Sequence, residues 1–391
     1  MRPALPTDAT AGPTDAGPLR AHNASLRHWL AHVAYPLWAS RGVDEVHGGF
    51  HELLGPEGPL AGEPRRARVQ VRQIYAFARA AGLGWQGDAA RLVVRGWEYF
   101  FRHYRRADGL YRTLVAADGA VLDDRALLYD QAFVLLALAE SRRFLGAMPD
   151  LDAATHALRL AIWQQFKRPG PGFAEHGAGG LLLPNPHMHL LEAAQNWIAV
   201  SGAETWRALA EEIVALALDQ LIDAGTGTLF ERSGGSWEAP AGSVTAHVEP
   251  GHQYEWAWLL FRWRGARCGA AAAAAARLVQ VGEQHGIRGG LAVMALDEQF
   301  IPCDGTARLW AQTERLKAAL AMARFTGRQE YTVMALQSLA ALSRYLRGDV
   351  PGLWWDRVSA AGELVHEPAP ASTLYHLVCA IGELGTALEH A

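Results

Sequence analysis

Cysteine is scarce in this sequence, and the residues that occur lie far apart. Cys268, Cys303 and Cys379 are odd in number and show none of the paired spacings that a disulfide framework or a zinc site requires. A fold held together by disulfides is therefore not expected. A reducing compartment, the cytoplasm, fits this pattern best.

Long apolar runs and runs of positive charge are also missing. No segment approaches the roughly 20 consecutive apolar residues that a membrane span needs. The formal net charge is −4, and the only dense basic group is Arg65, Arg66, Arg68 and Arg72. This pattern argues against a membrane or nucleic-acid partner. No glycine-rich phosphate loop follows a strand, so the sequence predicts no nucleotide and no other cofactor.

The beginning of the chain lacks the apolar stretch of a signal peptide. Residues 1–20 mix proline, alanine, threonine, aspartate and glycine, which is typical of a disordered lead. Half of the sequence is apolar and 19% is charged, which allows a sizeable core. We expect residues 21–391 to form a single catalytic domain, for the reason given by the repeat described next.

A glycine followed by apolar or aromatic residues recurs along the chain as a hairpin signal. Successive signals lie 55 to 63 residues apart, at Gly49, Gly109, Gly172, Gly227, Gly290 and Gly352. Two helical segments follow each signal, and residues 129–144 and 151–166 are an example. The first segment is apolar nearly all round and the second is amphipathic. Six such pairs predict an all-α fold, an (α/α)6 barrel of twelve helices, with short β-hairpins at the active-site end.

The starts of the apolar helices should converge on one mouth of this barrel. Polar residues occur there on otherwise apolar helices, and burying them without partners would be costly. A shared pocket explains all of them at once. The residues expected in this pocket are Arg72, Tyr129, Asp130, Asn185, His189, His252, Glu255, Trp310, Glu314 and His376.

His252 stands at the start of one of these helices, directly after a Pro-Gly breaker. Glu255 follows three residues later, on the same face of the predicted helix, where it could orient the imidazole as a general base requires. The alternative is a core histidine bonded to a backbone carbonyl. His187 and His189 form a His-x-His, but two such residues point to nearly opposite sides of a helix, so no metal site is predicted.

Three histidines, an arginine and carboxylates without a cysteine favour proton transfer over redox or nucleophilic chemistry. An imidazole can remove a proton next to a sugar carbonyl if the enediolate oxygen is stabilised, and Arg72 is the candidate for that oxygen. Arg72 could instead pair with a buried carboxylate. Trp310, and Trp354 or Trp355, could offer flat faces to a sugar, although Trp310 is also suited to the core.

Two other classes of protein remain open. An (α/α)6 barrel could hydrolyse glycosides with two carboxylates, chosen from Asp130, Glu255 and Glu314. The chain could also bind a partner without catalysis. Three histidines at one mouth favour neither alternative.

Four motifs resemble the N-acylglucosamine 2-epimerase superfamily, and most of all its D-mannose isomerase branch of aldose-ketose isomerases. They are NPHMHLLEA (185–193), PGHQYEW (250–256), RLWAQTE (308–314) and ASTLYHL (371–377). The resemblance runs from about residue 25 onward, and it implies the same (α/α)6 fold. Ala311 stands where relatives often carry proline.

The resemblance implies that His252 and His376 are the general acid/base pair and that His189 assists ring opening. Arg72, Asn185 and Glu255 would then orient the hydroxyls and the histidines. The expected reaction interconverts D-mannose and D-fructose through a cis-enediolate. The alternative is a 2-epimerase of the mannose/glucose or N-acylglucosamine type. The only expected partner is a monosaccharide substrate, and the chain would be a monomer or a homodimer.

Overall fold

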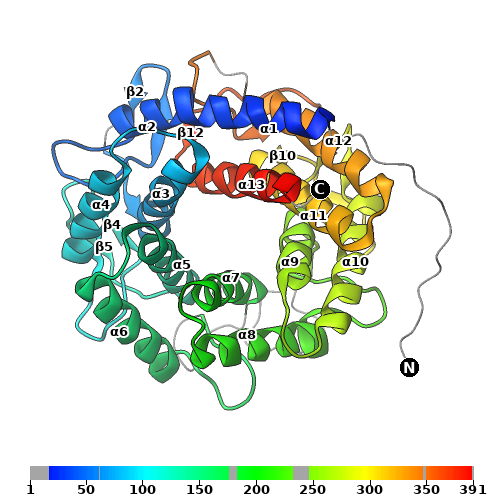
Figure 1. Ribbon diagram of the computed structural model, residues 1–391, viewed down its shortest axis with the longest axis horizontal. Helices are drawn as coiled ribbons and strands as arrows, with labels where there is room; N and C mark the ends of the chain where they lie inside the picture. Colours follow the sequence, from blue (N-terminus) through cyan, green and yellow to red (C-terminus); the bar gives the residue numbers. More distant parts are fainter. Residues whose placement is uncertain (1–16, 61, 176–182, 232–245, 347–348, 390–391) are drawn as a thin grey trace.

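Twelve helices form two concentric rings in the computed structural model (Figure 1), which describes residues 17–60, 62–175, 183–231, 246–346 and 349–389. The inner ring consists of α3 (Ala67–Ala80), α5 (Leu128–Leu145), α7 (Pro184–Ser201), α9 (Pro250–Arg262), α11 (Leu309–Thr326) and α13 (Ser372–Glu389). The outer ring consists of α1 (Gly17–Trp29) continued by α2 (Tyr35–Arg41), α4 (Ala89–Tyr104), α6 (Pro149–Gln165), α8 (Glu204–Leu216), α10 (Cys268–His285) and α12 (Gln329–Tyr345). The predicted (α/α)6 barrel is confirmed.

The two rings differ in burial, as the sequence periodicity predicts. In the inner helix α5 every residue from 130 to 141 is buried. Its outer neighbour α6 buries one stripe only, at the helical spacing i, i+3, i+4 and i+7, namely Leu151, Ala154, Thr155, Leu158, Ala161 and Ile162. Inner helices therefore have protein on all sides, whereas the opposite face of an outer helix meets solvent.

The first outer helix begins earlier than expected. Residues 17–20, which the composition assigned to a disordered lead, form the first turn of α1, and Leu19 is buried in the core. The remainder of the expected lead, residues 1–16, lies outside the described residues.

The ring closes where the first helices meet the last one. Helix α1 packs against α13, and the inner helices α3 and α13 also contact each other. Trp38 Nε1 donates to the carbonyl of Gly352 (3.2 Å), and Gln73 Nε2 donates to the carbonyl of Ala371 (2.6 Å). Strand β1 (Leu53–Gly55) pairs antiparallel with β12 (Ala369–Pro370). These contacts form the seam of the barrel.

Short strands lie before the inner helices. One sheet contains β12, β1 and β2 (Gly58–Pro59), and another contains β3 (Arg65–Arg66), β4 (Leu114–Val115) and β5 (Val121–Asp123). The two-stranded pairs are β6 (Ile287–Arg288) with β7 (Leu291–Ala292), β8 (Ala295–Leu296) with β9 (Pro302–Asp304), and β10 (Ala307–Arg308) with β11 (Arg357–Val358). β3, β10 and β12 lead directly into α3, α11 and α13, so the hairpins lie at the end where the inner helices begin.

In five inner helices, the side chain of the fourth residue forms a hydrogen bond with the backbone of the hairpin signal in the same repeat. Gln70 accepts from the N–H of Phe50 and donates to its carbonyl, both at 2.8 Å. A histidine accepts the equivalent N–H in the third repeat. The five pairs are Gln70 with Phe50, Gln131 with Tyr111, His187 with Phe173, Gln253 with Leu229, and Gln312 with Ala292. Buried backbone groups that would otherwise lack partners are thereby satisfied.

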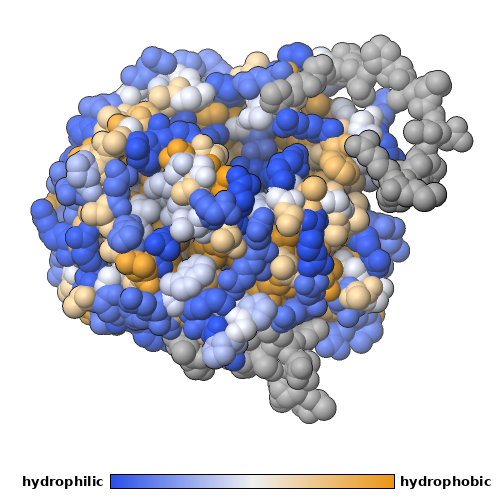
Figure 2. All heavy atoms as spheres, turned by 60° about the horizontal axis from the view of Figure 1, so that its bottom comes forward, coloured by the Kyte–Doolittle hydropathy of each residue, from blue (hydrophilic) through white to orange (hydrophobic). Residues whose placement is uncertain are grey.

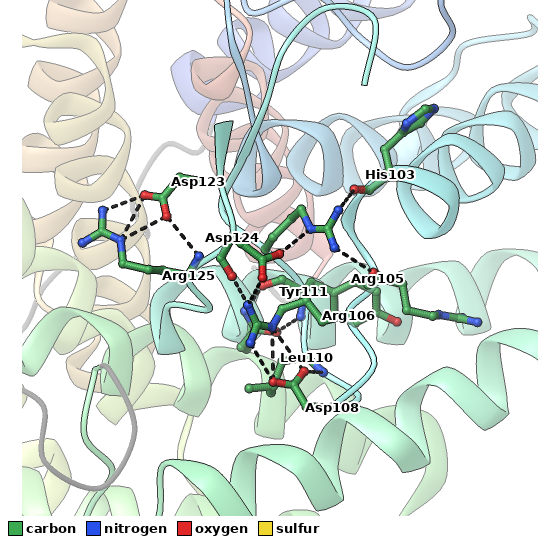
Figure 3. A network of polar contacts seen from close by, with 11 residues as sticks. His103, Arg105, Arg106, Asp108, Leu110, Tyr111, Asp123, Asp124 and Arg125 are labelled. Atoms are coloured by element: carbon green, nitrogen blue, oxygen red, sulfur yellow. Dashed lines mark hydrogen bonds and ion pairs between the residues drawn. The ribbon is translucent and has the colours of Figure 1, made fainter. Parts of the chain in front are cut away.

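An ion-pair network holds the loops around the β4–β5 hairpin on the outside of the barrel (Figure 3). Arg106 bridges Asp108 and Asp124 with contacts of 2.9 Å, and Arg125 pairs with Asp123 at 2.6 Å. Most of these side chains are partly or fully exposed, so each pair contributes little to stability. Hydrophilic residues also cover most of the face in Figure 2. Among the described helices, none is both long and apolar enough to cross a membrane.

Candidate active site

A cavity of about 290 Å³ opens at the end of the barrel where the inner helices begin. Every inner helix contributes at least one residue to its wall. The lining residues are Arg72, Tyr129, Asn185, His189, Glu249, His252, Glu255, Met294, Arg308, Trp310, Ser372, Thr373 and His376.

Eight of the residues predicted from the sequence line this cavity: Arg72, Tyr129, Asn185, His189, His252, Glu255, Trp310 and His376. Three others do not, namely Asp130, Glu314 and Trp354. Glu314 lies directly behind the cavity wall, where it contacts His376. The other two occupy different parts of the fold.

Asp130 faces away from the cavity. It is fully buried, pairs with Arg68 at 3.1 Å and accepts a hydrogen bond from Thr113. Its neighbour Tyr129 does line the cavity, because successive residues of a helix point about 100° apart. Asp130 therefore ties α5 to α3 and to the segment before β4 instead of meeting a substrate.

Trp354 belongs to the hydrophobic core at the seam. Its ring stacks on Trp38 with centroids 4.9 Å apart and meets Trp29 edge-on, and only 1% of the residue is exposed. It cannot offer a face to a sugar in the cavity. Trp310, by contrast, lies in the cavity between two histidines, 5.2 Å from His252 and 5.9 Å from His376.

His252 lies on the α9 side of the cavity and is held by two carboxylates. Its Nδ1 is 2.7 Å from Glu231 and 3.4 Å from Glu249, the residue just before α9. Burial alone would lower the pKa of this imidazole, but the negative charges of Glu249 and Glu231 outweigh it and raise the pKa to about 10. His252 is therefore an imidazolium at neutral pH.

The predicted partner of His252, Glu255, is not the residue that orients it. No hydrogen bond or ion pair joins the two among the described residues. Glu255 instead lies 3.9 Å from His189, and burial together with the charge of Glu314 raises its pKa well above the usual range. This shift favours the protonated form of Glu255, and its Oε1 has no hydrogen-bond partner in the described structure.

His376 lies on the α13 side of the cavity and, unlike His252, is neutral. Its Nδ1 is 2.9 Å from Glu314, and no described residue hydrogen-bonds to its Nε2. Burial, with the positive charges of Arg72 and Lys317, lowers its pKa well below the usual range. A neutral ring that donates from Nδ1 to a carboxylate keeps the lone pair of Nε2 available.

His189 is also neutral. Burial lowers its pKa to about 4, although Glu192, 3.4 Å from Nδ1, acts in the opposite direction. A neutral imidazole is a poor proton donor near pH 7. His189, which is expected to assist ring opening, is therefore better suited to accept a proton than to protonate the ring oxygen of a sugar.

Arg72 has no carboxylate partner in the described part of the chain. One of its terminal nitrogens donates to the hydroxyl of Tyr129 (2.9 Å), and the guanidinium lies 4.0 Å over the ring of Phe133. Its buried Nε has no partner among the described residues. A cation held by aromatic rings can still attract an oxygen anion in the cavity.

Two carboxylates and four wall residues were missed from the sequence. Glu231 and Glu249 orient His252, while Met294, Arg308, Ser372 and Thr373 complete the lining. A signal for Glu231 existed, because an acidic residue also ends the hairpin signals at Glu52, Glu175 and Asp356. Two of these equivalents also bind a charged partner at 2.7 to 2.8 Å, Glu52 with Arg66 and Asp356 with Arg308.

Within the described ranges, two groups of buried side chains have ligand atoms close enough to hold a metal ion. They are His189 with Glu192 and Glu255, and Glu255 with Glu314 and His376. The second group already has a cation beside it, since Lys317 Nζ lies 2.5 Å from Glu314 Oε2. His187, the other histidine of the His-x-His, accepts the N–H of Phe173 and lies outside both groups.

The fold and the cavity define a class of protein, an (α/α)6 barrel with histidine–carboxylate pairs suited to proton transfer. The model of the N-acylglucosamine 2-epimerase (GlcNAc 2-epimerase) family matches residues 48–380. The chain belongs to this family, and it is a sugar isomerase or epimerase.

The chain is also similar to individual members of this family, in sequence and in structure. The chain is 43% identical to a protein of Rhizobium meliloti named mannose-6-phosphate isomerase, over 93% of this chain and 97% of that one. It is 27% identical to a D-mannose isomerase of Thermobifida fusca, over 78% and 82% of the two chains. Among solved structures, a cellobiose 2-epimerase of Spirochaeta thermophila superposes with a TM-score of 0.84 at 19% identity, covering 97% of this chain and 99% of that one. A D-mannose isomerase gives 0.82 at 17%, covering 96% and 100%.

Proposed function

We propose that this chain is an aldose-ketose isomerase that interconverts D-mannose and D-fructose through a cis-enediolate. The observation that carries the proposal is the pair of histidines on either side of Trp310, one charged and one neutral. Such a pair supplies an acid and a base in one cavity at the same pH.

In this proposal His376 is the base. Its Nε2 removes the proton from C2 of the open-chain sugar, and the electrons of that bond form the C1–C2 double bond. The carbonyl oxygen on C1 becomes negative, and the His252 imidazolium protonates it while Arg72 stabilises the charge. His376 returns its proton to C1, and the hydroxyl proton on O2 goes back to His252. The ketose results, and both histidines recover their initial states.

Ring opening needs a different group. A base must take the proton of the anomeric hydroxyl so that the bond to the ring oxygen can break. Neutral His189, fixed by Glu192, is suited to this role. Glu255, 3.9 Å away and with its pKa raised by burial, is a candidate donor to the ring oxygen.

The 2-epimerase alternative uses the same enediolate. If a proton returns to the opposite face of C2, the product is the epimer, glucose from mannose. Histidines on two walls of the cavity would allow this outcome. The relatives named isomerases, at 43% and 27% identity, favour the ketose product.

The name of the Rhizobium meliloti relative makes mannose 6-phosphate a second candidate substrate. Arg308, whose side chain is 37% exposed, is the cation at the rim that could meet a phosphate. However, Asp356 already pairs with it at 2.8 Å, and the acidic Glu249 shares the cavity wall. This balance of charges favours the free sugar.

The deciding experiment incubates the purified protein with D-mannose, and separately with mannose 6-phosphate, in D2O, and follows products and label by NMR. Fructose as the product supports the isomerase, whereas glucose with deuterium at C2 would make the protein an epimerase. A clear preference for the phosphorylated sugar would replace the free-sugar assignment. If neither sugar gives a product or takes up deuterium, the proposal is overturned.

A further inference from the structure

Lys317 is a buried cation that the proposed mechanism does not use. The chain has only two lysines, Lys167 and Lys317, among 36 lysines and arginines. Lys167 lies on the outside of the barrel, where it pairs with Glu212 at 2.8 Å. The side chain of Lys317 is 0% exposed, in the interior of the inner ring. Burying an ammonium is costly unless neighbouring groups compensate for its lost hydration.

The contacts of Lys317 come from two helices. One turn earlier on α11, Glu314 places Oε2 2.5 Å from Nζ, as an ion pair whose angle is not that of a well-aligned hydrogen bond. On α9, the ring of Trp258 has its centroid 3.7 Å from Nζ, which is close enough for a strong cation–π contact. The ammonium therefore has a fixed position.

Glu314 connects Lys317 to the cavity. One oxygen of this carboxylate contacts Lys317, and the other lies 2.9 Å from His376 Nδ1. Burial raises the pKa of Glu314, and Lys317 is the main influence in the opposite direction. Glu192 and Glu255 add two more buried carboxyl groups to the same interior. Without the ammonium, burial would raise the pKa of Glu314 further and favour its protonated form.

The protonation of Glu314 decides which nitrogen of His376 carries hydrogen. An ionised Glu314 only accepts, so Nδ1 must be protonated and Nε2 keeps its lone pair. A protonated Glu314 would donate to Nδ1 and force the hydrogen onto Nε2, the nitrogen the proposed reaction needs as a base.

We propose that Lys317 is a positioning residue of the active site, which keeps Glu314 ionised and so holds His376 in the tautomer with a free Nε2. The role of Nε2 as a base rests on the proposed function. The tautomer itself does not depend on which sugar reacts.

The first test uses the unmodified protein. ¹⁵N NMR of histidine-labelled protein reports which ring nitrogens carry hydrogen, and His376→Gln identifies the His376 signals among those of the 16 histidines. We expect His376 to be neutral at pH 7 and protonated at Nδ1. A ring protonated at Nε2 alone, or a charged ring, would overturn the proposal.

The second test compares Lys317→Met with the matched control Lys167→Met. We expect Lys317→Met to move the His376 hydrogen to Nε2 and to lower kcat about 100-fold, within the range of general base catalysis, with KM changed less than about twofold. The control should leave the tautomer, kcat and KM unchanged. If Lys317→Met only lowers the melting temperature and keeps the tautomer and kcat, Lys317 is structural and the proposal fails.

A double-variant cycle tests whether Lys317 acts through Glu314. Adding Lys317→Met to Glu314→Gln should cause little further loss of kcat, because the carboxylate that Lys317 keeps ionised is already gone. Independent, multiplying losses would contradict the proposal. The double variant also removes both buried charges, so it provides a folded reference if Lys317→Met alone does not fold.

The tests separate this inference from the proposed function. If no sugar reacts but the spectrum shows the Nδ1 tautomer, and Lys317→Met changes it, only the reaction assignment fails. If mannose is isomerised but the tautomer does not respond to Lys317, only the positioning role fails.

Discussion

The α9 and α13 sides of the cavity carry the same kind of group in opposite states. Each presents a buried histidine near the start of an inner helix, and each histidine has a carboxylate on Nδ1. His252 has two carboxylates, of which Glu249 also contacts His247, and it stays charged. His376 has one carboxylate, which it shares with Lys317, and it lies near Arg72. Burial is nearly equal on both sides, at 7% and 6% exposure. The neighbouring charges therefore set the difference.

The largest effect should follow from removing either member of the pair. His376→Gln and His252→Gln keep polar side chains of similar size but cannot shuttle a proton, so kcat should fall about 10² to 10⁴-fold. His156→Gln, on the exposed face of α6, is the control and should retain full activity. Comparable residual activity in all three variants would mean that the two histidines are not an acid/base pair.

The pH dependence of the unmodified enzyme measures the contrast directly. His376 must be neutral to act as a base, and burial lowers its pKa well below the usual value of an imidazole, so the acid limb of the activity profile should also lie well below that value. His252 must be protonated to act as an acid, so activity should persist to about pH 10, its pKa, and fall above it. The measurement is kcat/KM from pH 4.5 to 10.5, and a narrow bell centred between pH 6 and 7 would contradict the assigned states.

Glu231→Gln should reduce the contrast from the α9 side. The loss of one negative charge beside His252 destabilises the imidazolium, so its pKa falls from about 10 and the alkaline limb moves to lower pH. We expect about a tenfold loss of kcat/KM at pH 9 and a smaller loss at pH 7. Glu212→Gln, a carboxylate that pairs with Lys167 far from the cavity, serves as the control, and an unmoved alkaline limb would speak against Glu231 as the source of the charge state.

Glu255→Gln should have the smallest effect of the four. Because burial and the charge of Glu314 favour the protonated form of Glu255, an amide of the same shape changes the local charge little. Some activity is lost if Glu255 donates to the ring oxygen, and we expect a fall of about tenfold or less in kcat. In that case ring opening becomes the slow step, and pre-steady-state assays that follow the formation of the open-chain sugar can detect the loss. A loss as large as that of His376→Gln would show that Glu255 acts as a carboxylate.

The sequence predicted the fold because the repeat is long and regular. Alternation of all-apolar and amphipathic segments at a period near 60 residues leaves few arrangements other than a double ring. The convergence of helix starts also predicted most of the cavity wall. The rotation of each helix was beyond this argument, so Tyr129 was correctly placed while the adjacent Asp130 was not.

Partners across loops were the other limit. The helical period suggested Glu255 for His252, but the side chain that binds this imidazole belongs to a hairpin 21 residues earlier. Loop geometry is not encoded in any period. Likewise nothing in the order of Trp354 and Trp355 indicated that the first would stack on Trp38, across the seam.

The seam between the ends of the chain has a consequence for biosynthesis. Arg72 and His376 face one cavity, but α3 is made early and α13 emerges from the ribosome about 300 residues later, the separation between Gln73 and its partner Ala371. Until then the apolar flank of α3 that α13 will cover is open to water. During synthesis this apolar surface stays exposed. We therefore expect the nascent chain to bind chaperones, and aggregation to begin at this surface if it does not.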